Sequence, residues 1–286
     1  MRLAQSLEEI IASRDVQDAI KFTAAMTQEQ RFTISEDFQE QYGTSVGDHI
    51  RKLMSPSSST SLLINMWLPV KILRLRVLER NLKELVPLEL AHCAITCTQE
   101  EFTEICDIYN TTSKSSLYAG IRKQCIGPQP WKYLVQQWIT FSRGSVSNMN
   151  FLRDQVRCAI ESVDGRLFVD TILSADGAIW PLVCKEYECQ YGTSLVKDLA
   201  AFGEESAPIL SFASLFICDQ TLAISYLLNQ FIMTGDNDGT GIVSALYSEA
   251  WYGASIAYAQ YGSMQEDIRA NFSSRYTEAL KTVWKI

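Results

Sequence analysis

A fourfold internal repeat constrains the fold of this chain more than any other feature of its sequence. A Tyr-Gly-Thr-Ser motif at residues 42–45 recurs at 191–194, and a Tyr-Gly-Ser form lies at 261–263. The serine-rich segment 113–117 holds the same place in between. The anchor positions are 71, 78 and 70 residues apart, at Gly43, Lys114, Gly192 and Gly262. Such repeats bury their hydrophobic faces only by stacking on one another. We therefore expect four repeats, at residues 1–69, 70–144, 145–217 and 218–286.

Helical patterns fill each repeat, and they predict about five helices per repeat and an all-α protein. In the first repeat the apolar spacing predicts helices at residues 6–12, 16–26, 28–42, 46–54 and 61–68. Alternating β-branched runs are short and isolated, so few strands are expected. A tryptophan lies near the end of three of the repeats at a matching offset, at Trp67, Trp138 and Trp284.

Capping signals recur in register with the repeat. Residues 27–30 and 98–101 each have the form of a capping box, in which a Thr hydroxyl and a Gln or Glu side chain satisfy the first amides of a helix. Asp176 is expected to be the equivalent N-cap of the third repeat, and in the fourth the helix is expected to begin near Ser248. A glycine after the motif tyrosine suits a left-handed C-cap.

Composition and charge exclude several classes of function. Hydrophobic residues make up 47% of the chain and charged residues 20%, and the net charge is −8. A protein this acidic repels nucleic acid, so no nucleic-acid partner is expected, and it also repels acidic lipid headgroups. Basic residues at 3–4 spacing predict the solvated side of one helix, at Lys71, Arg74, Arg76, Arg80 and Lys83.

No catalytic motif is recognisable, so the chain is not expected to be an enzyme. His92 and Cys93 adjoin in sequence, but on a helix they point in different directions, and no phosphate loop or nucleophile motif occurs. The N-terminus lacks the apolar core of a signal peptide. The eight cysteines therefore fit a reduced, cytoplasmic protein better than a disulfide framework.

Two apolar features have a membrane interpretation and a packing interpretation. Residues 207–233 are long enough to span a bilayer, but Asp219 in their middle favours two buried helices that meet at residues 218–220. Trp131 follows a Gly-Pro-Gln-Pro loop and is expected either to insert at headgroup depth or to pack inward.

Four repeats with this spacing of helices, caps and turns resemble the annexin family. The match is closest at residues 95–117 and 186–195, and it covers almost the whole chain. The divergence and the cysteine content look like the alpha-giardins, the annexin-like proteins of a flagellated protozoan parasite. The resemblance implies four repeats of five helices each in a slightly curved array, and a role at a membrane or cytoskeletal surface.

The resemblance also implies calcium as a cofactor. The family's site combines carbonyls of a glycine-rich loop, between the first two helices of a repeat, with a carboxylate between the last two. Calcium binds six to eight oxygens, and glycines let carbonyls converge on it. The matching positions in repeat four are Met233, Gly235, Asp236, Asp238 and Gly239, with Asn271 where the carboxylate is expected; those in repeat three are Asp164, Gly165 and Glu204. The alternative is that residues 235–241 form an ordinary Gly/Asp-rich turn.

The sequence is compatible with two functions. In the first, calcium bridges the acidic loops of repeats three and four to an acidic phospholipid membrane. In the second, the chain is a calcium-independent scaffold that has lost most calcium sites and binds microtubules or other cytoskeletal components. Either function predicts a cytoplasmic protein that is peripheral on the inner face of the plasma membrane or on the cytoskeleton.

Overall fold

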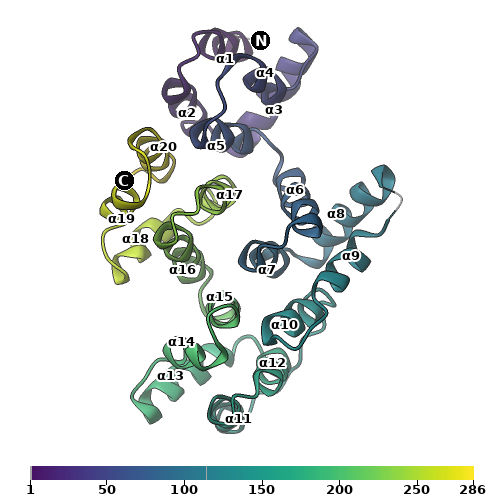
Figure 1. The fold of residues 1–286 in the computed structure, drawn as a ribbon, viewed down its shortest axis with the longest axis vertical. Coiled ribbons are helices and arrows are strands. Elements are labelled where there is room, and N and C mark those ends of the chain that lie inside the picture. The colour runs from purple at the N-terminus through teal and green to yellow at the C-terminus, as the bar shows by residue number, and fades with distance from the viewer. Residues whose placement is uncertain (1, 114) are drawn as a thin grey trace. The chain divides into compact units, whose positions relative to one another are not determined.

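Helices dominate the computed structural model, which describes residues 2–113 and 115–286 (Figure 1). Within these residues the only β-type pairing is an isolated bridge between Val146 and Ala175. The predicted all-α class is therefore confirmed. Lys114, one of the four anchors of the sequence repeat, lies outside the described residues.

Each expected repeat contains five helical segments. Those of repeat one are α1 Arg2–Ala12, α2 Val16–Ala24, α3 Gln28–Tyr42, α4 Val46–Leu53 and α5 Ser58–Met66. Those of repeat two are α6 Val70–Lys83, α7 Pro87–Thr96, α8 Gln99–Thr112, α9 Leu117–Gln124 and α10 Pro130–Trp138. Those of repeat three are α11 Met149–Glu161, α12 Gly165–Ser174, α13 Trp180–Tyr191, α14 Leu195–Asp198 with the 3₁₀ turn η1 Leu199–Phe202, and α15 Ser206–Cys218. Those of repeat four are α16 Gln220–Met233, α17 Asn237–Tyr247, α18 Gly253–Ala257 with η2 Tyr258–Gln260, α19 Met264–Asn271 and α20 Ser274–Trp284.

The helices pack into two compact units. One comprises residues up to 73 together with residues 224–286, and in it α5 packs on α17 and α2 on α20. The other comprises residues 74–223, and in it α7 and α10 both pack on α15. Each unit thus buries helices that are distant in sequence, as expected when stacked repeats share a core.

Buried tryptophans hold the fifth helix of a repeat to the second. In repeats one, two and four the indole Nε1–H donates across the core; the pairs are Trp67 to Thr23 Oγ1 at 3.0 Å, Trp138 to the Ile95 carbonyl at 3.2 Å, and Trp284 to Ser244 Oγ at 2.8 Å. Repeat three replaces this contact with Trp180 of α13, which donates to Ser214 of α15 at 3.0 Å. Trp131 is fully buried, so its inward packing is confirmed.

Local capping signals were good predictors of helix starts. Both capping boxes are present, at Thr27 with Gln30 and at Thr98 with Glu101. The first helix begins at Arg2 rather than residue 6, and the fifth spans Ser58–Met66 rather than 61–68, because Ser57 accepts from the Thr60 amide at 3.1 Å and sets an earlier start.

Two helix starts were predicted wrongly. The Asp176 carboxylate accepts from the Ala178 amide at 2.8 Å and closes a turn, and α13 begins only at Trp180. Ser248 lies at the C-terminal end of α17, because buried Tyr247 extends that helix, and the next one begins at Gly253.

The motif glycines Gly43 and Gly192 end α3 and α13 in the left-handed region, with φ of 69° and 70°, as predicted. Gly262 has a φ of 144° and follows a short 3₁₀ turn, so it is not a cap of the same type. The fourth helix of each repeat nevertheless follows the anchor position of that repeat, at α4, α9, α14 and α19.

The apolar stretch 207–233 forms two helices, α15 and α16, which meet at Asp219 as predicted. The Asp219 carboxylate accepts from the amides of Thr221 and Leu222 at 2.7 and 3.2 Å. No helix in the described part of the chain has both the length and the apolar character that crossing a bilayer requires.

Candidate calcium-binding loops

The loop between the first and second helices has one backbone form in three repeats. A residue in the left-handed region is followed by an aspartate that caps the second helix. The left-handed residues are Arg14 with φ 62°, Val163 with φ 52° and Gly235 with φ 65°; the aspartates are Asp15, Asp164 and Asp236. Only repeat four has glycine at the left-handed position, where glycine is the unstrained residue.

In repeat four this loop closes α16 tightly. The Gly235 amide donates to the Ile232 carbonyl and the Asp236 amide to the Phe231 carbonyl, both at 3.0 Å. This is the bond pattern that ends a helix at a left-handed glycine. Asp236 Oδ1 accepts from the Gly239 amide at 2.9 Å, so the carboxylate faces the first turn of α17.

Two of the predicted calcium glycines are explained by packing. Gly165 is the first residue of α12, and a Cβ there would overlap the ring of Pro130. Gly239 lies in the first turn of α17, and a Cβ there would overlap the ring of Phe231 and crowd the Asp236 carboxylate. Both glycines are buried, and both are needed where another residue comes this close.

The structure brings the two loops of repeat four together. The Asn271 carbonyl lies 3.8 Å from the position that a Cβ on Gly235 would take. The Asn271 side chain is exposed and its Nδ2 donates to the Asp267 carbonyl at 2.9 Å. Met233, the last residue of α16, is 56% exposed, and Asp238 is exposed in the first turn of α17.

The negative charge of this region affects the pKa of Tyr276. Its hydroxyl donates to the Asn237 carbonyl at 2.7 Å. Burial, and then the negative charges of Asp238 and Asp236, raise the pKa of Tyr276 above its usual range. Asp236 and Asp238 thus concentrate negative charge near the start of α17, as a cation site requires.

Repeat three also places its two loops side by side. Asp164 Oδ1 accepts from the Leu167 amide at 2.9 Å and caps α12. The ring of Phe202 lies 3.4 Å from the Cβ position of Gly165, and Glu204 follows in the exposed turn before α15. The two loops therefore supply the Asp164 carboxylate, which caps α12, and the exposed carboxylate of Glu204.

In repeat two, polar side chains stabilise the equivalent loop, between α6 and α7. Buried Asn81 accepts from the Val86 amide at 2.8 Å and donates to the Val77 carbonyl at 2.9 Å. Glu89 is buried beside Arg80 in an ion pair. In repeat two these contacts take the place of a glycine-rich loop.

No cluster of three or more acidic, histidine or cysteine side chains that could hold a metal occurs among residues 2–113 and 115–286. A site in repeat four would therefore depend on main-chain carbonyls beside two carboxylates. The residues fit calcium in this sense, because a left-handed glycine, a nearby Asn271 carbonyl and acidic side chains supply oxygens of the preferred type.

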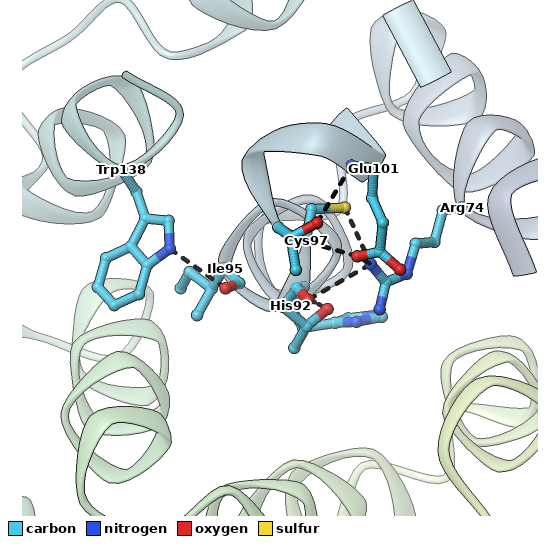
Figure 2. Close-up of polar contacts among 8 residues, drawn as sticks. Arg74, His92, Ile95, Cys97, Glu101 and Trp138 are labelled. Carbon is cyan, nitrogen blue, oxygen red and sulfur yellow. Dashed lines mark hydrogen bonds and ion pairs between the residues drawn. The ribbon is translucent and has the colours of Figure 1, made fainter. Parts of the chain in front are cut away.

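The polar core of repeat two was not foreseen from the sequence (Figure 2). Arg74 is only 4% exposed, so its assignment to a solvated face was wrong. Arg74 Nη1 donates to Glu101 Oε2 at 2.9 Å, to Cys97 Sγ at 3.1 Å and to the Thr96 carbonyl at 3.3 Å. The signal available in the sequence was Glu101, whose carboxylate also accepts from the Thr98 amide in the capping box at 3.0 Å.

Relieving strain at Val163 is expected to stabilise the protein. Val163 is β-branched, 58% exposed and left-handed, which costs roughly 1–2 kcal/mol. Val163→Gly should raise the free energy of unfolding by about 1 kcal/mol in urea denaturation, since the extra backbone entropy of glycine offsets part of the gain. Ser162→Gly, at an ordinary φ of −87°, is the matched control and should lower stability. If both substitutions lowered it, the strain argument would be wrong.

Comparison with known proteins agrees with this architecture. Residues 216–285 match the family model "Annexin E1, fourth repeat". Giardin subunit alpha-8 of Giardia intestinalis is 22% identical over 287 residues, covering 99% of this chain and 92% of the relative. Giardin subunit alpha-1 of the same organism is 21% identical and covers 99% and 98%.

Solved structures show the same fold. Calcium-bound alpha-1 giardin superposes with a TM-score of 0.89 at 20% identity, covering 99% of this chain and 98% of that one. Chicken annexin V superposes with a TM-score of 0.82 at 16% identity, covering 98% and 95%. The chain has the fold of these annexins and giardins, and its last repeat matches an annexin repeat. The relatives that it resembles along nearly its whole length include the alpha-giardins.

Proposed function

We propose that this protein binds acidic phospholipid membranes peripherally, with calcium bridging through the loops of repeats three and four. The observation that carries the proposal is the approach of the Asn271 carbonyl to the left-handed Gly235, beside the carboxylates of Asp236 and Asp238. Calcium-bound structures of similar giardins support it. The role is not enzymatic, and the protein acts in the cytoplasm.

Charge makes the bridging ion necessary to this proposal. The chain has a net charge of −8, and an acidic bilayer repels it at separations within the Debye length of about 8 Å. Bound calcium supplies positive charge and vacant positions that phosphate oxygens can fill. Asp238 is exposed and suits this role, whereas Asp236 would have to combine it with capping α17.

Vesicle sedimentation tests the proposal. The protein should sediment with phosphatidylserine-containing vesicles in millimolar calcium and stay in the supernatant in chelator. Asp236→Asn with Asp238→Asn retains a capping side chain but removes two charges, and should raise the calcium requirement by about tenfold or more. Asp15→Asn, at the equivalent cap of repeat one, is the matched control and should change nothing. Equal binding in calcium and in chelator would refute the bridging mechanism.

A second candidate function is a calcium-independent scaffold on the cytoskeleton, and a groove in the first unit favours it. The groove holds about 900 Å³ between α3 and the connection from α5 to α6. Phe32 lies in it and is 54% exposed. Thr103 takes the place of Phe32 in repeat two, so the repeat does not require an aromatic there.

The groove is lined by apolar and by acidic residues, which suits a basic, partly apolar segment of a filament protein. The apolar lining includes Met66, Trp67, Leu68 and Pro69; the acidic lining includes Glu29, Glu36, Glu40 and Glu249, of which Glu249 is paired with Arg31 at 3.2 Å. Co-sedimentation with microtubules and other filaments in chelator should be weakened by Phe32→Thr and not by Glu104→Gln in repeat two. Failure to bind any filament would remove this alternative. Both functions are compatible in one protein.

A further inference from the structure

Two cysteines, one in α13 and one at the C-terminal end of α15, lie with their sulfur atoms in contact. Cys184 lies in α13, and Cys218 is the last residue of α15. Cys218 Sγ donates to Cys184 Sγ at 3.5 Å, and Ser214 Oγ lies 3.8 Å from Cys184 Sγ. Both cysteines belong to the unit of residues 74–223, so one packed body sets their separation.

The two sulfur atoms are close enough for a small side-chain movement to join them. A disulfide bond is about 2.0 Å long, so closing this pair needs the sulfurs to approach by about 1.5 Å. Both side chains are half-buried, which leaves room for a small oxidant. Of the other six cysteines, Cys93, Cys97 and Cys125 are buried and Cys158 and Cys189 are exposed, whereas Cys106 is also half-buried. The pair therefore combines partial access with a ready partner.

The two thiols differ in a way that suits stepwise oxidation. The hydrogen bond from Cys218 is the main cause that lowers the pKa of Cys184, whereas the same contact raises the pKa of Cys218. The thiolate is the nucleophile in cysteine oxidation, so Cys184 attacks first and Cys218 resolves.

We propose that Cys184 and Cys218 form a reversible disulfide when the protein meets a peroxide. The Cys184 thiolate attacks one oxygen of hydrogen peroxide, the O–O bond breaks, and the departing hydroxide takes a proton to leave as water. The sulfur of Cys218 then attacks the resulting sulfenic acid, the S–S bond forms, and hydroxide leaves with the thiol proton as the second water. The two sulfurs lose two electrons in total, and the peroxide gains them.

The bond would tie α13 to the C-terminal end of α15. The closed loop holds α14, η1 and the turn at residues 203–205, which includes Glu204. Oxidation therefore restricts the segment that supplies the second loop of repeat three. The inference concerns only the thiols, so it stands or falls independently of calcium or membrane binding.

Mass spectrometry of the full chain tests the inference. Reduced protein is treated with hydrogen peroxide, the remaining thiols are alkylated with N-ethylmaleimide, and the protein is digested without reductant. A peptide with Cys184 joined to Cys218 should appear, two alkylation sites should be lost, and dithiothreitol should restore both. Cys184→Ser or Cys218→Ser should abolish the product. Cys189→Ser, on the same helix but exposed, should leave it intact.

Thermal unfolding provides a second measurement that does not depend on peptide recovery. Oxidised wild-type protein and oxidised Cys189→Ser should unfold several degrees above their reduced forms, because the cross-link restricts the unfolded chain. Cys184→Ser should show no such shift. A peroxide-induced cross-link between other cysteines, or oxidation of Cys184 to sulfinic acid with Cys218 still alkylated, would overturn the proposal.

Discussion

Lowering the pH from about 7 to about 4 is expected to destabilise the native state, because the unfolded chain protonates His92 before the native state does. His92 lies in α7 and is fully buried. Burial, followed by the positive charges of Arg74 and Arg80, lowers the pKa of His92 to about 3 from 6.5. The unfolded chain therefore binds a proton near pH 6.5, whereas the native state does so only near pH 3.

The sign of this effect is fixed by which state binds the proton first. The contribution of neutral His92 to the free energy of unfolding is fully present above pH 6.5. It falls as the pH drops from 6.5 towards 3, because only the unfolded state gains the proton over that range. At about 1.4 kcal/mol per pH unit, the loss is about 3–4 kcal/mol at pH 4 and about 4–5 kcal/mol by pH 3. This is a large part of the stability of an ordinary domain.

Urea denaturation of the wild type and of His92→Gln at a series of pH values checks this expectation. The variant should be less stable at neutral pH, because a buried side chain is replaced, but its stability should depend less steeply on pH between 6.5 and 4. His49→Gln replaces the other histidine of the chain. If that substitution flattened the pH dependence as much as His92→Gln, the assignment to His92 would be wrong.

Local interactions explain why so much of the helix order could be predicted from the sequence. A capping box provides hydrogen-bond partners for amides within four residues. Thr27 and Thr98 therefore predict the starts of α3 and α8 from local sequence alone. The left-handed caps at Gly43 and Gly192 are equally local. Repetition of such signals at intervals of 71, 78 and 70 residues indicated the four-repeat architecture.

Tertiary contacts explain the failures. Arg74 has the spacing of a solvated helix position, and nothing near it in sequence shows that α8 brings Glu101 to within 2.9 Å. Aspartate is a favourable N-cap residue, but the chain forms a turn after Asp176, and α13 begins only at the buried Trp180. In both cases the neighbours that decide the outcome are supplied by the fold.

The candidate calcium loops show the same limit in another form. A glycine in a sequence pattern does not reveal whether its missing Cβ frees a carbonyl or makes room for a neighbour. Gly239 admits the ring of Phe231 and Gly165 that of Pro130, whereas Gly235 occupies a left-handed turn. Conversely, Arg14 and Val163 adopt that turn without glycine, so an eroded motif did not mean a different loop backbone.

Trp284→Ala is expected to be among the most destabilising single substitutions in this chain. Trp284 is fully buried at the end of α20, and its indole donates to Ser244 Oγ of α17 at 2.8 Å. Removing a buried tryptophan leaves a large cavity and typically costs about 3–5 kcal/mol. Ile256→Ala, at a site that is 69% exposed in the same unit, should change stability by no more than about 0.5 kcal/mol.

The hydrogen bond can be separated from the packing by a double-mutant cycle. Ser244 is also fully buried, so Ser244→Ala should leave the indole N–H of Trp284 without its acceptor and cost about 1–3 kcal/mol. In the background of Trp284→Phe, which keeps much of the ring but has no donor, the same substitution should cost clearly less. Thermal or urea unfolding of the four proteins gives the coupling energy. Equal costs in the two backgrounds would show that the indole bond adds nothing, and that packing alone holds α20 to α17.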